Sequence, residues 1–239
     1  MFSICIYINL ILPYLNSNHI YYTCKQIYNL KKKKLLQLNM KYSNKYIIDS
    51  TFQNIINQYL IVHLNLHQID LPNFILPNNI INVKLTFSNT DSLVQFTNVK
   101  NIEIYGCNNI YDLNDLKNVE VASIKLCQNI IDISALNKCK QVSLNHCKCI
   151  TNISSLYNVE RVFISNCHNI KSFNYLLKAK LLYLTNCDSL IDVSIFKNIQ
   201  KLYIHHCKNI INYAILDVSA SIIHYSNIQN NSLHLYYDK

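Results

Sequence analysis

Apolar and polar positions recur with a period of 20 residues along the C-terminal half of the chain. The first part of each period alternates apolar and polar residues, which predicts a short β-strand with one buried face. In the second part of each period an apolar residue recurs at every third position. This second part is too short to hold a full α-helix. A turn followed by a 3₁₀ or irregular arm fits that spacing. Each period is therefore expected to form one strand, one turn and one short return arm.

A cysteine marks the same place in six successive periods. Apolar residues stand five and three positions before it and three, six and nine positions after it, and in the first five periods also twelve positions after it. A fixed period of this length is typical of stacked repeats, whose single units bury too little apolar surface to fold alone. The pattern predicts six regular units over residues 99–218, with atypical units at both ends. The six cysteines are Cys107, Cys127, Cys147, Cys167, Cys187 and Cys207.

The repeating motif L-x-x-L-x-L-x-x-C-x-x-I resembles the strand motif of the leucine-rich repeat family. Residues 139–147 and 159–167 are two examples, and residues 132–136 resemble the D-I-S-x-L return arm of its short repeats. The resemblance covers about residues 80–230. It implies an α/β solenoid: a short leucine-rich-repeat coil with a parallel β-sheet on the concave face, 3₁₀ or irregular return arms and a small helical N-terminal cap. Residues 76–87 resemble an FNIP-type repeat, a related short coil.

The six repeat cysteines are expected to form a structural ladder inside the coil, because the resemblance implies that this position points inward. A buried thiol behaves as a small apolar group with a weak donor. Disulfides are the first alternative, but side chains in stacked units point in parallel, which does not suit a disulfide bridge. Metal binding is the second, at residues 147–149 or 205–207, and neither cluster has the C-x-x-C spacing of a zinc site. We expect free thiols in a reducing compartment and no metal.

The N-terminal residues 1–42 predict a separate helical module. Residues 11–15 and 23–30 resemble parts of an F-box, although the opening segment is missing and the linker is short. The resemblance implies a degenerate F-box whose residues 11–30 dock on the scaffold subunit of a ubiquitin ligase, as in F-box and short-repeat proteins of large DNA viruses and some protists. A chance match in a chain rich in Tyr and Ile is the alternative. Residues 43–61 predict one amphipathic helix that caps the first coil of a solenoid over 62–239.

Composition and charge narrow the function classes further. The 239 residues are 50% hydrophobic and 15% charged, and the net charge is +9. Basic proteins often bind nucleic acid, but here the charge is spread along the chain, so we do not expect nucleic acid as the partner. A single glycine excludes glycine-rich phosphate loops, and no arrangement of catalytic residues is recognised. We expect a protein that is not an enzyme and carries no cofactor.

The first twelve residues are apolar, but this stretch is shorter than a bilayer span and lacks the basic start and cleavage site of a signal peptide. No membrane association is therefore expected. Together with the free thiols, this places the expected location in the cytoplasm or nucleus of a host or eukaryotic cell. The protein is expected to be a monomer.

Function is expected on the strand residues that point away from the core, at six, four and two positions before each cysteine. In the last three units these positions carry aromatic and cationic side chains, which are enriched at binding hot spots. Stacked aromatic residues that only stabilise neighbouring strands are the alternative. The candidate partner-binding residues are Arg161, Phe163, Tyr183, Lys201, Tyr203 and His205.

These features together predict a protein-binding scaffold whose partner lies on the concave strand face. The F-box resemblance extends this to a substrate-recognition adaptor of a ubiquitin ligase. Two other classes stay open: a structural or decoy repeat protein without a ligase link, and a nucleic-acid-binding protein, which would show salt-dependent binding.

Overall fold

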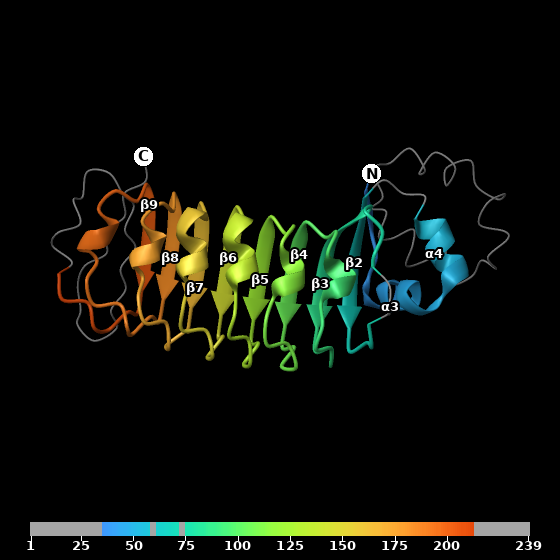
Figure 1. Cartoon of the computed structure of the whole chain (residues 1–239), viewed down its shortest axis with the longest axis horizontal. Helices are drawn as coiled ribbons and strands as arrows, with labels where there is room; N and C mark the ends of the chain where they lie inside the picture. The colour runs from blue at the N-terminus through green and yellow to red at the C-terminus, as the bar shows by residue number, and fades with distance from the viewer. Residues whose placement is uncertain (1–34, 58–60, 72–74, 213–239) are drawn as a thin grey trace.

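Each 20-residue period forms one turn of an elongated coil in the computed structural model, which describes residues 35–57, 61–71 and 75–212 (Figure 1). The strands pair in parallel in a single nine-stranded sheet whose order follows the chain. This arrangement confirms the predicted α/β solenoid. The strands are β1 (Leu35–Gln37), β2 (Ile61–His67), β3 (Ile80–Thr86), β4 (Asn101–Tyr105), β5 (Val121–Lys125), β6 (Gln141–Asn145), β7 (Arg161–Ser165), β8 (Leu181–Thr185) and β9 (Lys201–His205).

The strand register stacks equivalent residues in columns. From β4 to β9 each residue pairs with the residue 20 positions later, as Ile104 does with Ile124. Between β3 and β4 the offset is 19, because Leu85 pairs with Ile104. This shorter step explains why the upstream unit is one residue out of phase in the sequence. An inward column therefore buries one apolar residue per unit, and an outward column displays one side chain per unit.

Short 3₁₀ segments form the return arms on the side of the coil opposite the sheet (Figure 1). Each arm begins with a polar residue five positions after the cysteine, whose side chain accepts a hydrogen bond from the backbone N–H two residues later. Asp132 accepts from Ser134 at 2.8 Å, and Asp192 from Ser194 at 2.7 Å. Asp, Asn and Ser favour such turns. The 3₁₀ segments are η2 (Val94–Phe96), η3 (Asn114–Leu116), η4 (Ser134–Lys138), η5 (Ser154–Asn158), η6 (Asn174–Leu176) and η7 (Ser194–Phe196).

The residue before each ladder cysteine has a left-handed backbone with φ between 51° and 65°. Its N–H continues the ladder, as Leu126 N–H donates to the Asn145 carbonyl at 2.9 Å. Gly106 is the only glycine of the chain, and a Cβ there would lie 2.6 Å from the ring of Phe87. Glycine is therefore favoured at position 106 for two reasons: the backbone is left-handed there, and the Phe87 ring leaves no room for a side chain. The residues in this column are Gly106, Leu126, His146, Asn166, Asn186 and His206.

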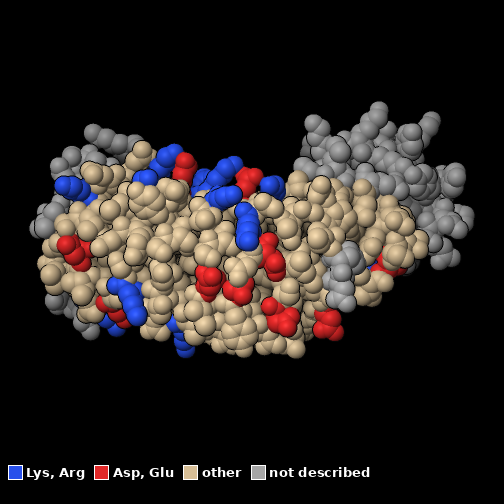
Figure 2. Space-filling view, viewed as in Figure 1, with Lys and Arg blue, Asp and Glu red and all other residues tan. Residues whose placement is uncertain are grey.

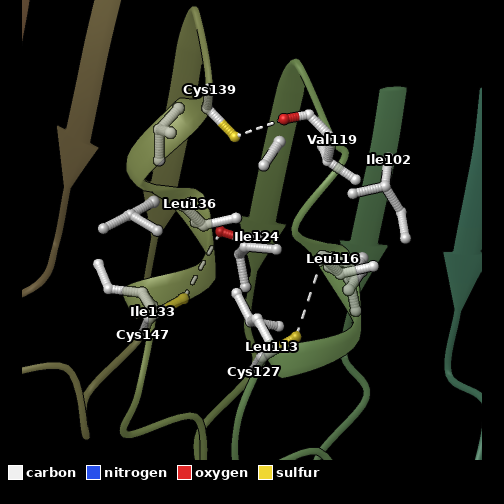
Figure 3. Close-up of a cluster of buried hydrophobic side chains, with 14 of the residues drawn as sticks. Ile102, Leu113, Leu116, Val119, Ile124, Cys127, Ile133, Leu136, Cys139 and Cys147 are labelled. Carbon is white, nitrogen blue, oxygen red and sulfur yellow. Dashed lines mark hydrogen bonds between the residues drawn. The ribbon is translucent and has the colours of Figure 1, made fainter. Parts of the chain in front are cut away.

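All six ladder cysteines lie in the core, with at most 2% of their surface exposed. Each thiol donates to the carbonyl two residues before it, and most also reach a carbonyl of the previous unit, as Cys147 does to Ile124 at 3.5 Å (Figure 3). Cys139 takes the apolar place that opens a unit, and its thiol donates to Val119 at 3.1 Å. The eight cysteines in the described part of the chain are free thiols.

The N-terminal end differs from the sequence prediction in two ways. Residues 35–37, placed in the helical module 1–42, form strand β1 beside β2, and Leu36 and Leu38 are buried in the solenoid core. The segment 43–61, predicted as one helix, forms helix α3 (Met40–Ile48) and helix α4 (Ser50–Ile56), and its last residue starts β2. The break has a local cause: Asp49 is extended and caps α4 by accepting a hydrogen bond from Phe52 N–H at 2.9 Å.

Helix α3 covers the end of the sheet that the three-residue strand β1 leaves open. The Ser43 hydroxyl accepts a hydrogen bond from Asn65 N–H at 2.7 Å. The Asn44 amide pairs with both backbone groups of His67, at 2.9 and 3.1 Å. These side chains replace the neighbouring strand that the rest of β2 lacks, which blocks a sheet edge that could otherwise pair with another chain. Ser43 and Asn44 thus pair strand backbone rather than cap the helix start, which Asn39 does.

Two predicted segments lie outside the described residues. They are the F-box-like segment 11–30 and the end of the predicted solenoid, residues 213–239. Both stay predictions.

Candidate partner-binding face

The outer face of the sheet is built from three columns of side chains that point away from the core. Along each regular strand the first, third and fifth residues face outward, while the second and fourth are buried. The columns cross the strands at right angles, because each register step carries a residue to its equivalent in the next unit. The chemistry of this face is set by which residue each unit places in each column.

The middle column becomes aromatic in the last three units. Phe163, Tyr183 and Tyr203 pair directly across β7, β8 and β9. Their ring centroids lie 6.3 Å and 5.7 Å apart, with planes tilted by 32° at both steps. The three rings therefore make one continuous surface, called the aromatic row below. The ring of His205, in the next column, lies 5.1 Å from that of Tyr183 and widens the row.

The column on the other side of the aromatic row carries cations. Arg161 and Lys201 are exposed, and the half-buried Leu181 stands between them on β8. Neither cation forms a salt bridge with a residue in the described part of the chain. The structure thus gathers all six candidate residues on the outer face of β7–β9, with Arg161 and Lys201 separated by one strand.

The other half of the same face carries a row of hydrogen-bonded polar side chains and a cluster of paired charges. A groove over β2–β5 is lined by polar side chains that include His63, Asn82 and Asn101, which are hydrogen-bonded in a row. Glu103 lies 3.1 Å from Lys125 and 3.5 Å from Lys84. Burial raises the pKa of Glu103, but the two ammonium groups outweigh it, so this carboxyl has a pKa below its ordinary value.

Sequence reasoning missed the residues of this polar half. The cluster joins Lys84, Glu103 and Lys125, which do not share a column in the sequence pattern, because β3 is offset by 19 residues and Lys125 belongs to the neighbouring column. It also missed the contact of Phe87 with the Tyr105 ring, at 5.1 Å between centroids. The one available signal for Phe87 was the lone glycine, Gly106, against which the ring lies.

The fold divides the cluster at residues 147–149, one of the two considered for metal binding. Cys147 is buried, whereas Cys149 is exposed, so their side chains do not converge. Among the residues that the structure describes, no three His, Cys, Asp or Glu side chains gather as metal ligands would. In residues 35–57, 61–71 and 75–212 no helix has the length and apolar character that crossing a bilayer requires.

The fold has a counterpart among solved structures. An internalin from Listeria monocytogenes matches with a TM-score of 0.51 and 16% identity, over 75% of this chain and 71% of the internalin. At this identity the likeness concerns the fold alone, and it agrees with the leucine-rich-repeat architecture expected from the motif. No protein-family model and no curated protein matches the sequence.

Proposed function

We propose that this chain is a non-enzymatic protein-binding solenoid whose partner docks on the aromatic row. The observation that carries the proposal is the continuous surface of Phe163, Tyr183 and Tyr203 across three neighbouring strands at one end of the sheet face. The two ring contacts are tilted and separated by more than 5.5 Å, so they leave ring surface for a ligand. Large rigid side chains bind with little loss of conformational entropy, and Tyr is among the commonest hot-spot residues.

Replacing Tyr183 with Ala is expected to weaken peptide binding by at least about tenfold, or roughly 1.4 kcal/mol, because it removes the centre of the row. The measurement uses a random peptide library displayed on phage, selected on the immobilised full chain, followed by titration of the best synthetic peptide. The stability of the variant should fall by no more than about 2 kcal/mol, since Tyr183 has two cross-strand aromatic partners and each such pair contributes about 0.2–1 kcal/mol.

The matched control is Tyr175→Ala, which removes an exposed tyrosine from a return arm. This variant should bind the selected peptide as the unchanged chain does. If the triple change Phe163→Ala, Tyr183→Ala and Tyr203→Ala leaves binding intact, the partner does not use this face and the proposal is wrong.

The finer proposal is that residues 11–30 dock on the scaffold subunit of a ubiquitin ligase, which would make the protein a substrate adaptor. Its support is the F-box resemblance of these residues, which lie outside the described part of the chain. Such an adaptor would work in the cytoplasm or nucleus, and free thiols suit those reducing compartments. A structural or decoy role remains the competing function, because it needs the same solenoid without the docking segment.

The adaptor proposal predicts that the full chain co-purifies with the ligase scaffold subunit and that the double variant Ile27→Asp, Leu30→Asp does not. Two charges on an apolar docking strip should lower recovery by more than about tenfold. Substitution is a cleaner test than a truncation at Lys41, which would remove β1 and the buried Leu38. Equal recovery of both chains, or recovery of neither, would contradict the adaptor role and leave the solenoid proposal standing.

A further inference from the structure

The column beside the aromatic row alternates in chemistry across the last three strands. Arg161 pairs in register with Leu181, and Leu181 with Lys201. The order is therefore cation, apolar residue, cation, and each member lies next to one ring of the aromatic row. This order is a feature of the fold, because the three residues are 20 positions apart in the sequence.

The two cations lack an acidic neighbour on their own face. The outward positions of β6–β9 contain no Asp or Glu. Glu160, which precedes Arg161, bonds Lys180 at 2.9 Å, and Lys180 together with the more weakly acting Arg161 holds the pKa of Glu160 below its ordinary value. Acidic and basic side chains intermingle along one long edge of the molecule (Figure 2). On β3–β5, by contrast, Glu103 already satisfies both neighbouring lysines. On the outer face, an acidic residue thus accompanies the cations of β3–β5, whereas none accompanies Arg161 and Lys201 on β6–β9.

Resting on the proposed function, we infer that the partner offers a peptide segment in the polyproline II conformation with two carboxylates three residues apart and an apolar residue between them. Neighbouring strands lie about 4.8 Å apart, so the backbones at Arg161 and Lys201 are separated by roughly 10 Å. A polyproline II chain advances about 3.1 Å per residue and returns to the same face every three residues, so side chains three residues apart lie on one face about 9 Å apart. The carboxylates meet the two cations, and the apolar side chain lies over Leu181 and Tyr183.

The alternation favours a peptide over a nucleic-acid strand. Single-stranded nucleic acid also stacks on aromatic rows, but it carries a phosphate at every nucleotide and needs a continuous cationic track. Here Leu181 occupies the centre of the track, where it would face a phosphate without a counter-charge. An apolar side chain gains from contact with Leu181 instead.

The test compares peptide pools selected on three forms of the full chain by phage display. The first is the unchanged protein, the second carries Arg161→Glu and Lys201→Glu, and the third carries Lys171→Glu and Lys208→Glu. The last pair makes the same change in net charge at exposed lysines outside the sheet. We expect the unchanged and control chains to enrich two acidic residues spaced by three around an apolar one. The charge-reversed face should enrich basic residues at the same spacing, because complementary charges determine which partner is accepted.

Affinity measurements complete the test. The best acidic peptide should lose at least about tenfold in affinity on the charge-reversed face and keep its affinity on the control, with a weaker contrast at 1 M salt. Peptides that need Tyr183 but show no acidic bias would overturn this inference and leave the proposed function intact. A failure to enrich any peptide that depends on Tyr183 would overturn both. The inference would also be overturned, in favour of nucleic acid, if an oligo-thymidine strand of about 20 nucleotides bound more tightly than the best acidic peptide and lost its binding on Tyr183→Ala.

Discussion

Replacing Cys167 with Asp is expected to lower the free energy of unfolding by several kcal/mol, because a carboxylate would enter a core position that solvent does not reach. Cys167 is 0% exposed, and its thiol bonds the Ser165 carbonyl at 3.4 Å. An ionised Asp could not donate that hydrogen bond and would face carbonyl oxygens instead. Urea denaturation followed by circular dichroism measures the change. A loss of several kcal/mol is a large part of the stability of a typical domain, which is about 5–15 kcal/mol.

Two matched variants separate burial from chemistry. Cys149→Asp places the same charge at the exposed cysteine and should change stability by less than about 0.5 kcal/mol. Cys167→Ser keeps a donor of similar size and should cost less than Asp does. A Cys167→Asp variant within about 1 kcal/mol of the unchanged chain would show that the ladder position is hydrated in solution.

Stability is expected to fall between about pH 9 and pH 11, because the buried thiols of Cys127 and Cys139 stay neutral in the folded protein while they ionise in the unfolded chain. Burial raises the pKa of Cys127 to about 11 and that of Cys139 to about 12. Burial also raises the pKa of Cys107. In this range the unfolded state binds fewer protons than the folded state, so stability decreases as the pH rises. The stabilisation is fully present below the unfolded pKa and is lost as the pH passes through the folded one.

Each such thiol contributes about 1.4 kcal/mol of lost stability per pH unit above the unfolded pKa, so Cys127 and Cys139 together remove roughly 5 kcal/mol near pH 11, which is the whole stability of a marginal protein. Urea midpoints at pH 8, 9, 10 and 10.5 under reducing conditions give the slope. The variant Cys139→Val copies the residue at the same place in the neighbouring units, Val119 and Val159. It should reduce the slope of stability against pH by the contribution of one ionising thiol. An identical slope in both proteins would mean that Cys139 ionises in the folded state as it does in the unfolded one.

The regular units could be predicted from the sequence almost in full. A column that repeats every 20 residues places each side chain inside or outside without knowledge of its neighbours, because every unit has nearly the same surroundings. Ile104, Ile124 and Leu144 are buried in equivalent places for this reason. The alternating strand residues also identified Phe163, Tyr183 and Tyr203 as one outward column before any coordinates.

The N-terminal end could not be predicted in the same way. No repeat relates residues 35–57 to another part of the chain, so local pattern alone had to distinguish one helix from two. The capping hydrogen bond of Asp49 and the pairing of Ser43 and Asn44 with β2 depend on residues that local periodicity does not connect. The 19-residue step between β3 and β4 likewise hid the contact of Lys84 with Glu103.

The sequence by itself determined the repeat length, the parallel sheet, the inward cysteines and the outward aromatic column. The inward position of the cysteines follows from the family resemblance of the motif. The other features follow from periodicity, because burial of apolar area acts on every unit alike and leaves one arrangement that buries all of them. Only the tertiary structure decided the ring separations, the pairing of Glu103 with two lysines and the lack of an acidic neighbour for Arg161 and Lys201 on the face. Those features depend on distances of a few ångströms between side chains on different strands, and Coulomb and hydrogen-bond energies change steeply over such distances.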